Sequence, residues 1–246
     1  MEENLNETNE INEAETKGPV RLWIENFWYH YKWHSIVSIF IVFIITICSL
    51  QMCRKTDYDV HFLYGGGKYI SRTAEDGNFC EFEIINSSLK QITKDYDENG
   101  QITPNFYDLY LLSEEELKEV ADKVNPTTLY YNNQEFRNIM FSSNFYICFL
   151  SEDLYREYAK TEGVFAPIKP YTDNRQDLDY LDECAVYLHS SNLPFNRLPG
   201  ICDFPENTVI CLKSKTAFSA SALTNTDKEQ FARSEESLKA LFNYGR

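Results

Sequence analysis

The longest apolar run in the chain lies between Lys32 and Arg54, where no Asp, Glu, Lys or Arg occurs. Its centre, from Ile36 to Leu50, reads IVSIFIVFIITICSL. As a helix, residues 34–53 would span roughly 30 Å, which is the thickness of the hydrocarbon core of a bilayer. A helix buried in a soluble domain is seldom apolar on every side for so long. The pattern therefore predicts a single transmembrane helix at 34–53.

Aromatic side chains crowd the segment 18–33, just before this run. It contains all three tryptophans of the chain, Trp23, Trp28 and Trp33. Amphipathic rings favour the headgroup layer of a membrane, so we predict an interfacial aromatic segment, as a short helix lying on the bilayer. The preceding residues 1–17 are rich in Glu and Asn and are predicted to form a disordered acidic tail.

Residues 54–246 alternate short apolar runs with amphipathic stretches. Strand-length runs occur at 58–64, 144–150, 164–168 and 208–212, and helical spacing occurs at 113–124, 126–141, 151–163 and 226–242. Strands that alternate with helices predict one α/β domain with a mainly parallel or mixed sheet.

Two helix starts are marked by polar residues. Ser113 and Glu116 have the spacing of a capping box, and the side chains that follow, Leu117 and Val120 among them, are expected to form one buried face. Ser151 is expected to cap the helix that follows the strand at 144–150.

Composition, charge and the absence of catalytic motifs limit the classes of function that we expect. The 246 residues carry a net charge of −15, and the pI is near 4.7, which lacks the basic footprint of a nucleic-acid-binding protein. No Ser stands in a GxSxG motif, and no paired Cys and His or paired carboxylates stand in a catalytic context, so we expect no enzyme. Basic residues are balanced on the two sides of the apolar run, so charge alone does not decide the orientation.

A ligand site is predicted at the end of the first strand. Gly65, Gly66 and Gly67 follow it directly, and ligands of open α/β sheets bind at strand carboxyl ends. Glycine lets a ligand meet the backbone, and Tyr69 offers an aromatic wall. A flexible turn explains the same glycines.

A cation site is a second candidate. Asp95, Asp97 and Asn99, followed by Gly100, match the first half of a calcium loop, in which oxygens at alternate positions approach the ion. Position 12 is Phe106 instead of a bidentate Glu. A polar Asx-type turn is the alternative, so calcium is left open and no other cofactor is expected.

Two cysteines are predicted to face each other near the carboxyl terminus. If Glu206 and Asn207 form the loop of a β-hairpin within 201–212, Cys202 stands opposite Cys211, near enough for a disulfide if the two form a non-hydrogen-bonded pair.

Two resemblances add to these observations. FWYHYKWHSI at 27–36, the apolar run, Arg54 with Lys55, and YDVHFLY at 58–64 resemble the start of small single-pass membrane proteins of unknown function from Gram-positive anaerobes. The segment 144–171, NFYICFLSEDLYREYAKTEGVFAPIKPY, is similar to a stretch of extracytoplasmic solute-binding proteins.

The resemblances imply a location and a role. The short amino terminus is expected in the cytoplasm, and the domain at 54–246 outside the cell membrane. There it is expected to bind a small solute or an envelope protein, with no nucleic-acid partner. The alternative is a non-enzymatic structural or accessory subunit of a membrane complex.

Overall fold

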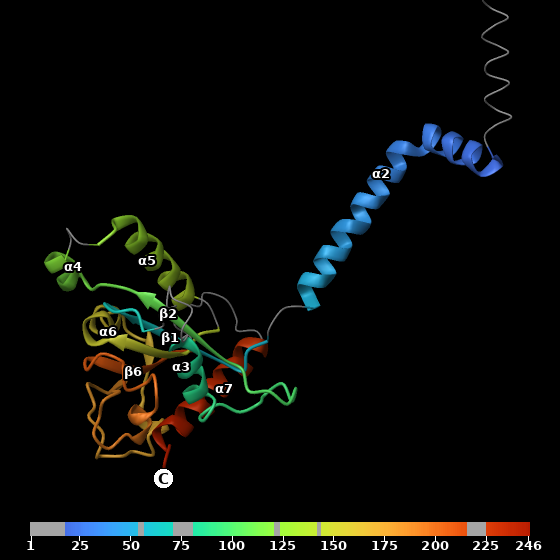
Figure 1. Ribbon diagram of the computed structural model, residues 1–246. Coiled ribbons are helices and arrows are strands. Elements are labelled where there is room, and N and C mark those ends of the chain that lie inside the picture. Colours follow the sequence, from blue (N-terminus) through green and yellow to red (C-terminus); the bar gives the residue numbers. More distant parts are fainter. Residues whose placement is uncertain (1–17, 54–56, 71–80, 121–123, 142–143, 216–224) are drawn as a thin grey trace, which may run out of the picture. The chain divides into compact units, whose positions relative to one another are not determined.

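The structure of the chain is a computed structural model (Figure 1), and it describes residues 18–53, 57–70, 81–120, 124–141, 144–215 and 225–246. It divides into two compact units, Met1–Thr56 and Asp57–Arg246. The predicted acidic tail at 1–17 lies outside the described residues.

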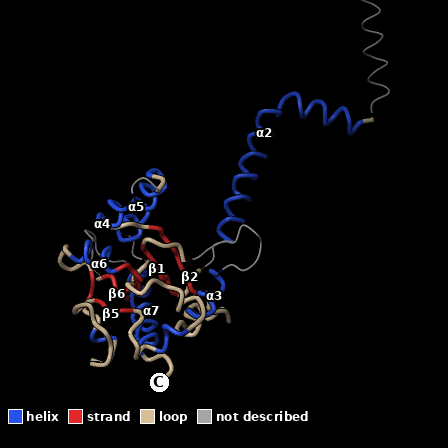
Figure 2. The backbone as a smooth tube through the Cα atoms, turned by 60° about the vertical axis from the view of Figure 1, so that its left-hand side comes forward, coloured by secondary structure: helices blue, strands red, loops and turns tan. Residues whose placement is uncertain are grey.

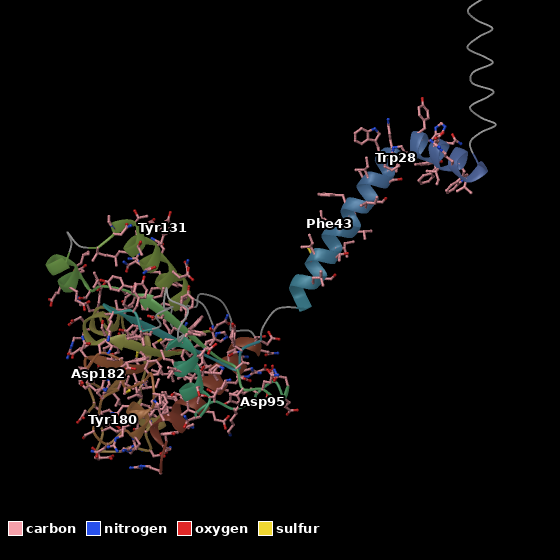
Figure 3. The ribbon with its side chains drawn as sticks, in the orientation of Figure 1. Trp28, Phe43, Asp95, Tyr131, Tyr180 and Asp182 are labelled. Carbon is pink, nitrogen blue, oxygen red and sulfur yellow. The ribbon has the colours of Figure 1, made fainter. Side chains whose placement is uncertain are left out.

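The first unit is built on one helix, α2 (Pro19–Cys53). At 1.5 Å per residue its 35 residues extend about 52 Å, well beyond the ~30 Å of a bilayer core. The part from Trp23 to Leu50 is long and apolar enough to cross a membrane. The predicted segments 18–33 and 34–53 are thus joined in one helix, although Figure 3 shows a bend in the region of Trp28.

Aromatic rings form a ladder along the amino-terminal part of α2. Trp23, Phe27 and Tyr31 are spaced four residues apart, and their ring centroids follow each other at 5.6 and 5.3 Å. Residues four apart lie on one face of a helix. The tryptophan-containing segment therefore carries a continuous aromatic stripe on α2.

The second unit is an α/β domain with a six-stranded mixed sheet in the order β2-β1-β3-β6-β4, and β5 also pairs with β6. The neighbouring strands β2, β1 and β3 are parallel, with β2 at the edge of the sheet, and β6 is antiparallel to its neighbours. The strands are β1 (Val60–Gly66), β2 (Pro104–Tyr110), β3 (Ile147–Ser151), β4 (Phe165–Ala166), β5 (Ala185–Tyr187) and β6 (Thr208–Lys213). The predicted class, an α/β domain with a mainly parallel or mixed sheet, is confirmed.

Helices cover both faces of the sheet (Figure 2). The apolar side chains of α3 (Glu81–Leu89) and α7 (Asn225–Phe242) pack with Phe62 and Tyr64 in one core. Those of α5 (Pro126–Phe141) and α6 (Glu152–Ala159) pack with Leu63 and Leu150 in a second core on the opposite face. The helix after β1 and the helix after β3 therefore lie on opposite faces, which makes the gap between these strand ends a topological switch point.

The capping box of α4 (Glu114–Val120) is confirmed. Ser113 Oγ accepts the backbone N–H of Glu116 at 3.2 Å, and a Glu116 carboxylate oxygen accepts the N–H of Ser113 at 2.8 Å. The predicted buried face is wrong at Leu117, which is 38% exposed. The first turn of this short helix is therefore fixed by the cap and not by burial of Leu117.

The predicted hairpin at 201–212 is wrong. Cys202 is exposed and lies in a turn, whereas Cys211 pairs with Cys148 of β3 and with Ala185 of β5. The flanking backbone bonds from Lys213 to Tyr146 and from Glu152 to Asn207 make Cys148 and Cys211 a hydrogen-bonded pair. That geometry sets their Cα atoms about 5.5 Å apart, and both thiols are free.

Candidate functional site

The four residues predicted to contact a ligand divide between the interior and the surface. Gly65 and Gly66 are buried at the end of β1, whereas Gly67 and Tyr69 are exposed. Tyr69 stacks on Tyr110 at the end of β2, with 5.2 Å between ring centroids. Ligand binding here stays a prediction, and the exposed pair gives a ligand its access to this edge of the sheet.

Close packing explains the glycine at position 66. A Cβ atom there would lie 2.6 Å from Tyr64 Oη and 3.5 Å from Ser151 Cβ. At Gly65 a Cβ would meet the Cδ atoms of three leucines at 3.1–3.2 Å. Both glycines are strand residues, so the flexible turn that the sequence offered is wrong for them.

Three buried hydroxyl groups gather at the same edge. Tyr64, Ser151 and Thr208 are 0%, 3% and 0% exposed, and among the described residues their hydroxyls have no hydrogen-bond partner. Ser151 and Thr208 are register partners on β3 and β6, and Tyr64 Oη and Ser151 both adjoin Gly66. We call these three residues the hydroxyl cluster. Each unpartnered buried hydroxyl costs about 1–3 kcal/mol, so the cluster needs an explanation.

Ser151 occupies the N-cap position of α6, as predicted, but its side chain makes no capping hydrogen bond. The first helical N–H, that of Glu152, is instead bonded to the carbonyl oxygen of Asn207 at 2.9 Å. The Ser151 hydroxyl is therefore not used to begin the helix, which leaves it in the hydroxyl cluster.

The surroundings of the hydroxyl cluster are acidic. Burial raises the pKa of Tyr64, and the carboxylates of Asp108 and Glu116 raise it further. Asp108 is the register partner of Tyr64 on β2 and accepts the N–H of Ile70 at 2.8 Å. A Glu116 oxygen would lie 3.0 Å from a Cβ at Gly67. These two carboxylates place negative charge near the Tyr64 hydroxyl, and the exposed Lys68 follows at the same strand end.

The predicted cation loop lies near the amino end of β1. Its Asp95 and Asp97 carboxylates come within 4.8 Å of that of buried Asp59, which the sequence analysis missed. Asp95 accepts the N–H groups of Asn99 and Gly100 at 3.2 and 2.7 Å. The Asn99 side chain donates to Asp97 at 2.6 Å. The Asx-type turn is present, and calcium binding stays a prediction.

Hydrogen bonds to the Asp59 side chain connect this loop to the start of β1. Its two carboxylate oxygens accept the N–H groups of Tyr96 at 2.7 Å and Thr103 at 2.8 Å. An Asn at 59 would present an amide donor to one of these N–H groups. We expect Asp59→Asn to lower the free energy of unfolding by about 2 kcal/mol in urea denaturation of the full chain.

The matched control is Asp97→Asn, which changes an exposed carboxylate and should cost under about 0.5 kcal/mol. Equal losses in the two variants would contradict the assigned role of Asp59. The same samples, melted with and without millimolar calcium, test the cation prediction. A calcium-dependent rise in melting temperature that Asp97→Asn abolishes would confirm it.

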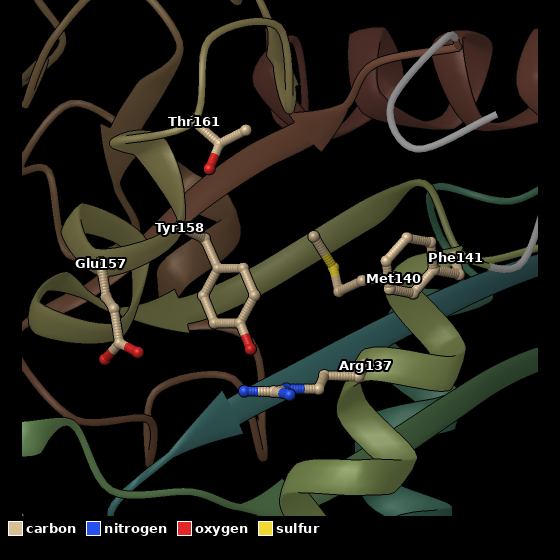
Figure 4. Close-up of a pocket in the computed structure, with 6 residues that line it drawn as sticks. All are labelled: Arg137, Met140, Phe141, Glu157, Tyr158 and Thr161. Atoms are coloured by element: carbon tan, nitrogen blue, oxygen red, sulfur yellow. The ribbon is translucent and has the colours of Figure 1, made fainter. Parts of the chain in front are cut away.

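A surface cavity of about 290 Å³ lies between α5 and α6 (Figure 4). Met140 and the Tyr158 ring form apolar walls, and the Arg137 guanidinium lies beside the Tyr158 hydroxyl. Burial raises the pKa of Tyr158, which keeps this phenol neutral. A second cavity of about 280 Å³ adjoins it at Thr161 and has an acidic rim that includes Asp182.

Neither of these two cavities is lined by the glycines at the end of β1. Volumes of about 290 and 280 Å³ stand at the lower end of the range for small-molecule pockets, roughly 300–1,000 Å³. Tyr69, predicted to form an aromatic wall beside Gly65–Gly67, lines neither cavity. Among the described residues, the candidate binding feature near Gly65–Gly67 is the hydroxyl cluster and not one of these cavities.

Comparison with protein-family models, with curated proteins and with solved structures finds no match to this chain.

Proposed function

We propose that the protein is a membrane-anchored binding domain, held by α2 and exposed outside the cell, for a small solute or an envelope protein. The observation that carries this proposal is the concentration of unsatisfied polar groups at the carboxyl edge of β1 and β3. Open α/β sheets bind their ligands at such an edge. No catalytic role is assigned, because the polar groups there serve recognition without an activated nucleophile.

The anchor is supported by the length and composition of α2. The resemblance of 27–36 and 58–64 to single-pass membrane proteins supports an orientation with the amino terminus in the cytoplasm. Long domains translocate largely regardless of their charge, so a net charge of −15 does not oppose it.

Topology is the first test. External protease added to intact cells or protoplasts should degrade the domain after Arg54 and leave an epitope at the amino terminus protected. The readout is an immunoblot with tags at both ends, and permeabilised cells control for the accessibility of the amino-terminal tag. A protected domain with an accessible amino-terminal epitope would overturn the proposed location.

An accessory-subunit role is favoured by exposed aromatics on α5. Tyr130, Tyr131 and Phe141 are 61%, 66% and 62% exposed, and Figure 3 shows Tyr131 on the outer side of the helix. Exposed aromatic side chains are enriched at protein interfaces. Co-purification from membranes in mild detergent tests the part that α5 plays: a stoichiometric partner lost in Tyr131→Ser supports the accessory subunit, and a partner retained by that variant contradicts docking on α5.

A further inference from the structure

We infer that the cavity between α5 and α6 binds a small zwitterion that carries an apolar group, which is the chemistry of a free α-amino acid such as leucine. The cavity is lined by neither the glycines at the end of β1 nor the hydroxyl cluster, so this site goes beyond the proposed function. Three features of the cavity support the assignment, which are its room, the two opposite charges on its wall and its apolar side.

The cavity has room for a molecule of amino-acid size. Its volume of about 290 Å³ corresponds to roughly ten water molecules at about 30 Å³ each. Leucine has a similar number of non-hydrogen atoms. Because the cavity lies at the surface, a solute reaches it without opening of the core (Figure 4).

The wall is held in place by core packing. The Tyr158 ring packs edge-on against Phe136, with 4.9 Å between centroids, and Phe136 is fully buried. Met140 is 1% exposed, and its backbone carbonyl accepts the Lys213 ammonium group at 3.2 Å. A ligand therefore meets a preformed surface, which lowers the entropic cost of binding.

Two opposite charges stand on this wall without neutralising each other. Arg137 of α5 and Glu157 of α6 both line the cavity, and within the described part of the chain neither forms an ion pair. Figure 4 shows the Arg137 guanidinium beside the Tyr158 hydroxyl. Burial raises the pKa of Tyr158, Arg137 lowers it and Glu157 raises it, so both charges act at this hydroxyl.

The carboxylate and ammonium groups of an amino acid match these two charges. A guanidinium binds a carboxylate through paired N–H donors, and the neutral Tyr158 phenol adds an O–H donor. The Glu157 carboxylate accepts the N–H groups of an ammonium ion. A ligand with one charge would be repelled by Glu157 or by Arg137, whereas a zwitterion satisfies both. A zwitterion is also neutral overall, so a chain of net charge −15 does not repel it.

The other side of the cavity is apolar. Met140 and Phe141 lie at the end of α5, and Figure 4 shows both across Tyr158 from Glu157. The Phe141 side chain is 62% exposed, so an apolar group that packs on its ring removes apolar surface from water. This wall favours an amino acid with an apolar side chain over glycine.

The experiment measures the melting temperature of the full chain in detergent with leucine, methionine and phenylalanine as probes. Three analogues of leucine each lack one feature: isoamylammonium lacks the carboxylate, isocaproate lacks the ammonium group, and glycine lacks the apolar side chain. We expect leucine to raise the melting temperature in a saturable way, by about 5 °C at about 100 times its dissociation constant. Each analogue should need an about tenfold higher concentration for the same shift.

Variants of the two charges make the test specific to this cavity. Arg137→Gln and Glu157→Gln should each raise the leucine concentration for half the maximal shift by about tenfold. Isoamylammonium should bind Arg137→Gln at least as well as the wild type, and isocaproate should do the same with Glu157→Gln. The matched control is Lys160→Gln, which removes an exposed charge that does not line the cavity and should leave the leucine response unchanged. Without ligand, the three variants should melt within about 2 °C of the wild type.

Two results would overturn the inference. One is no response of the wild type to leucine, methionine and phenylalanine. The other is a response that Arg137→Gln and Glu157→Gln both leave unchanged, which would place the binding outside this cavity. Either result leaves the protease experiment and ligand binding at the carboxyl edge of the sheet intact, so the inference and the proposed function fail separately.

Discussion

Replacing Gly66 with Val is expected to lower the free energy of unfolding by about 3 kcal/mol. The added Cβ would lie 2.6 Å from Tyr64 Oη, and two methyl groups would extend further toward the same core. Because Tyr64 is fully buried, its ring cannot rotate out of the way without opening the core around it. Urea denaturation of the full chain, followed by tyrosine fluorescence, measures the loss.

A double-mutant cycle gives the control. Gly66→Ala alone should cost about 1–2 kcal/mol, and combining it with Tyr64→Phe, which removes the closest atom, should recover roughly 1 kcal/mol of that loss. Strict additivity of the two changes would contradict the assigned contact. The close contact with Tyr64 Oη makes Gly66 a packing position as well as a predicted ligand contact.

The elements predicted best are those whose secondary structure is determined by their own residues. The helix α5 has the predicted bounds, 126–141, because Pro126 is suited to a first turn and the chain that follows has helical spacing. The runs at 144–150 and 208–212 form central strands, since a strand buried on both faces is apolar throughout. The last helix buries Phe231 and Leu238 as its spacing predicts.

The missed elements depend on contacts that are distant in the sequence. In β2, the sequence PNFYDLY lacks strict alternation of polar and apolar residues, and it follows the loop of Asp95 and Asp97 so closely that it suggests the end of a calcium motif. Its strand is defined by parallel pairing with β1, some 44 residues earlier. Short β5 likewise depends on its partner β6.

The candidate site was predicted from its position in the fold and not from its chemistry, and ligand binding there stays a prediction. Because strand carboxyl ends collect ligands, the run of glycines directed attention to the edge of the sheet at which the hydroxyl cluster lies. The hydroxyls of Tyr64, Ser151 and Thr208 come from three separate strands, and only the strand order and register bring them together. A signal exists in hindsight: Ser151 and Thr208 are polar ends of otherwise apolar strands.

Replacing Lys213 is expected to cause the second large loss in the free energy of unfolding. Its buried ammonium group donates to the carbonyl oxygens of Ile139 and Met140, at 3.3 and 3.2 Å, at the end of α5. The Tyr146 ring lies 5.1 Å from the same nitrogen. Lys213→Ala removes both hydrogen bonds and the long apolar stem of the side chain, so we expect a loss of about 3 kcal/mol in the free energy of unfolding. Lys213→Met keeps the volume and should lose about 1 kcal/mol or less.

The pH dependence separates the charge of Lys213 from its packing. Burial lowers the pKa of Lys213 from 10.5 to about 8. The unfolded chain then binds more protons than the folded chain between pH 8 and 10.5, so stability rises with pH in that window. From pH 8 to 9.5 the wild type should gain about 1.5 kcal/mol relative to Lys213→Met. The measurements stay below pH 10, because above it tyrosines ionise in the unfolded chain. Their pKa values are raised in the folded chain, so their ionisation lowers stability as the pH rises. A parallel pH profile in the two proteins would show that Lys213 keeps an ordinary pKa, and the helix end would then owe its stability to packing alone.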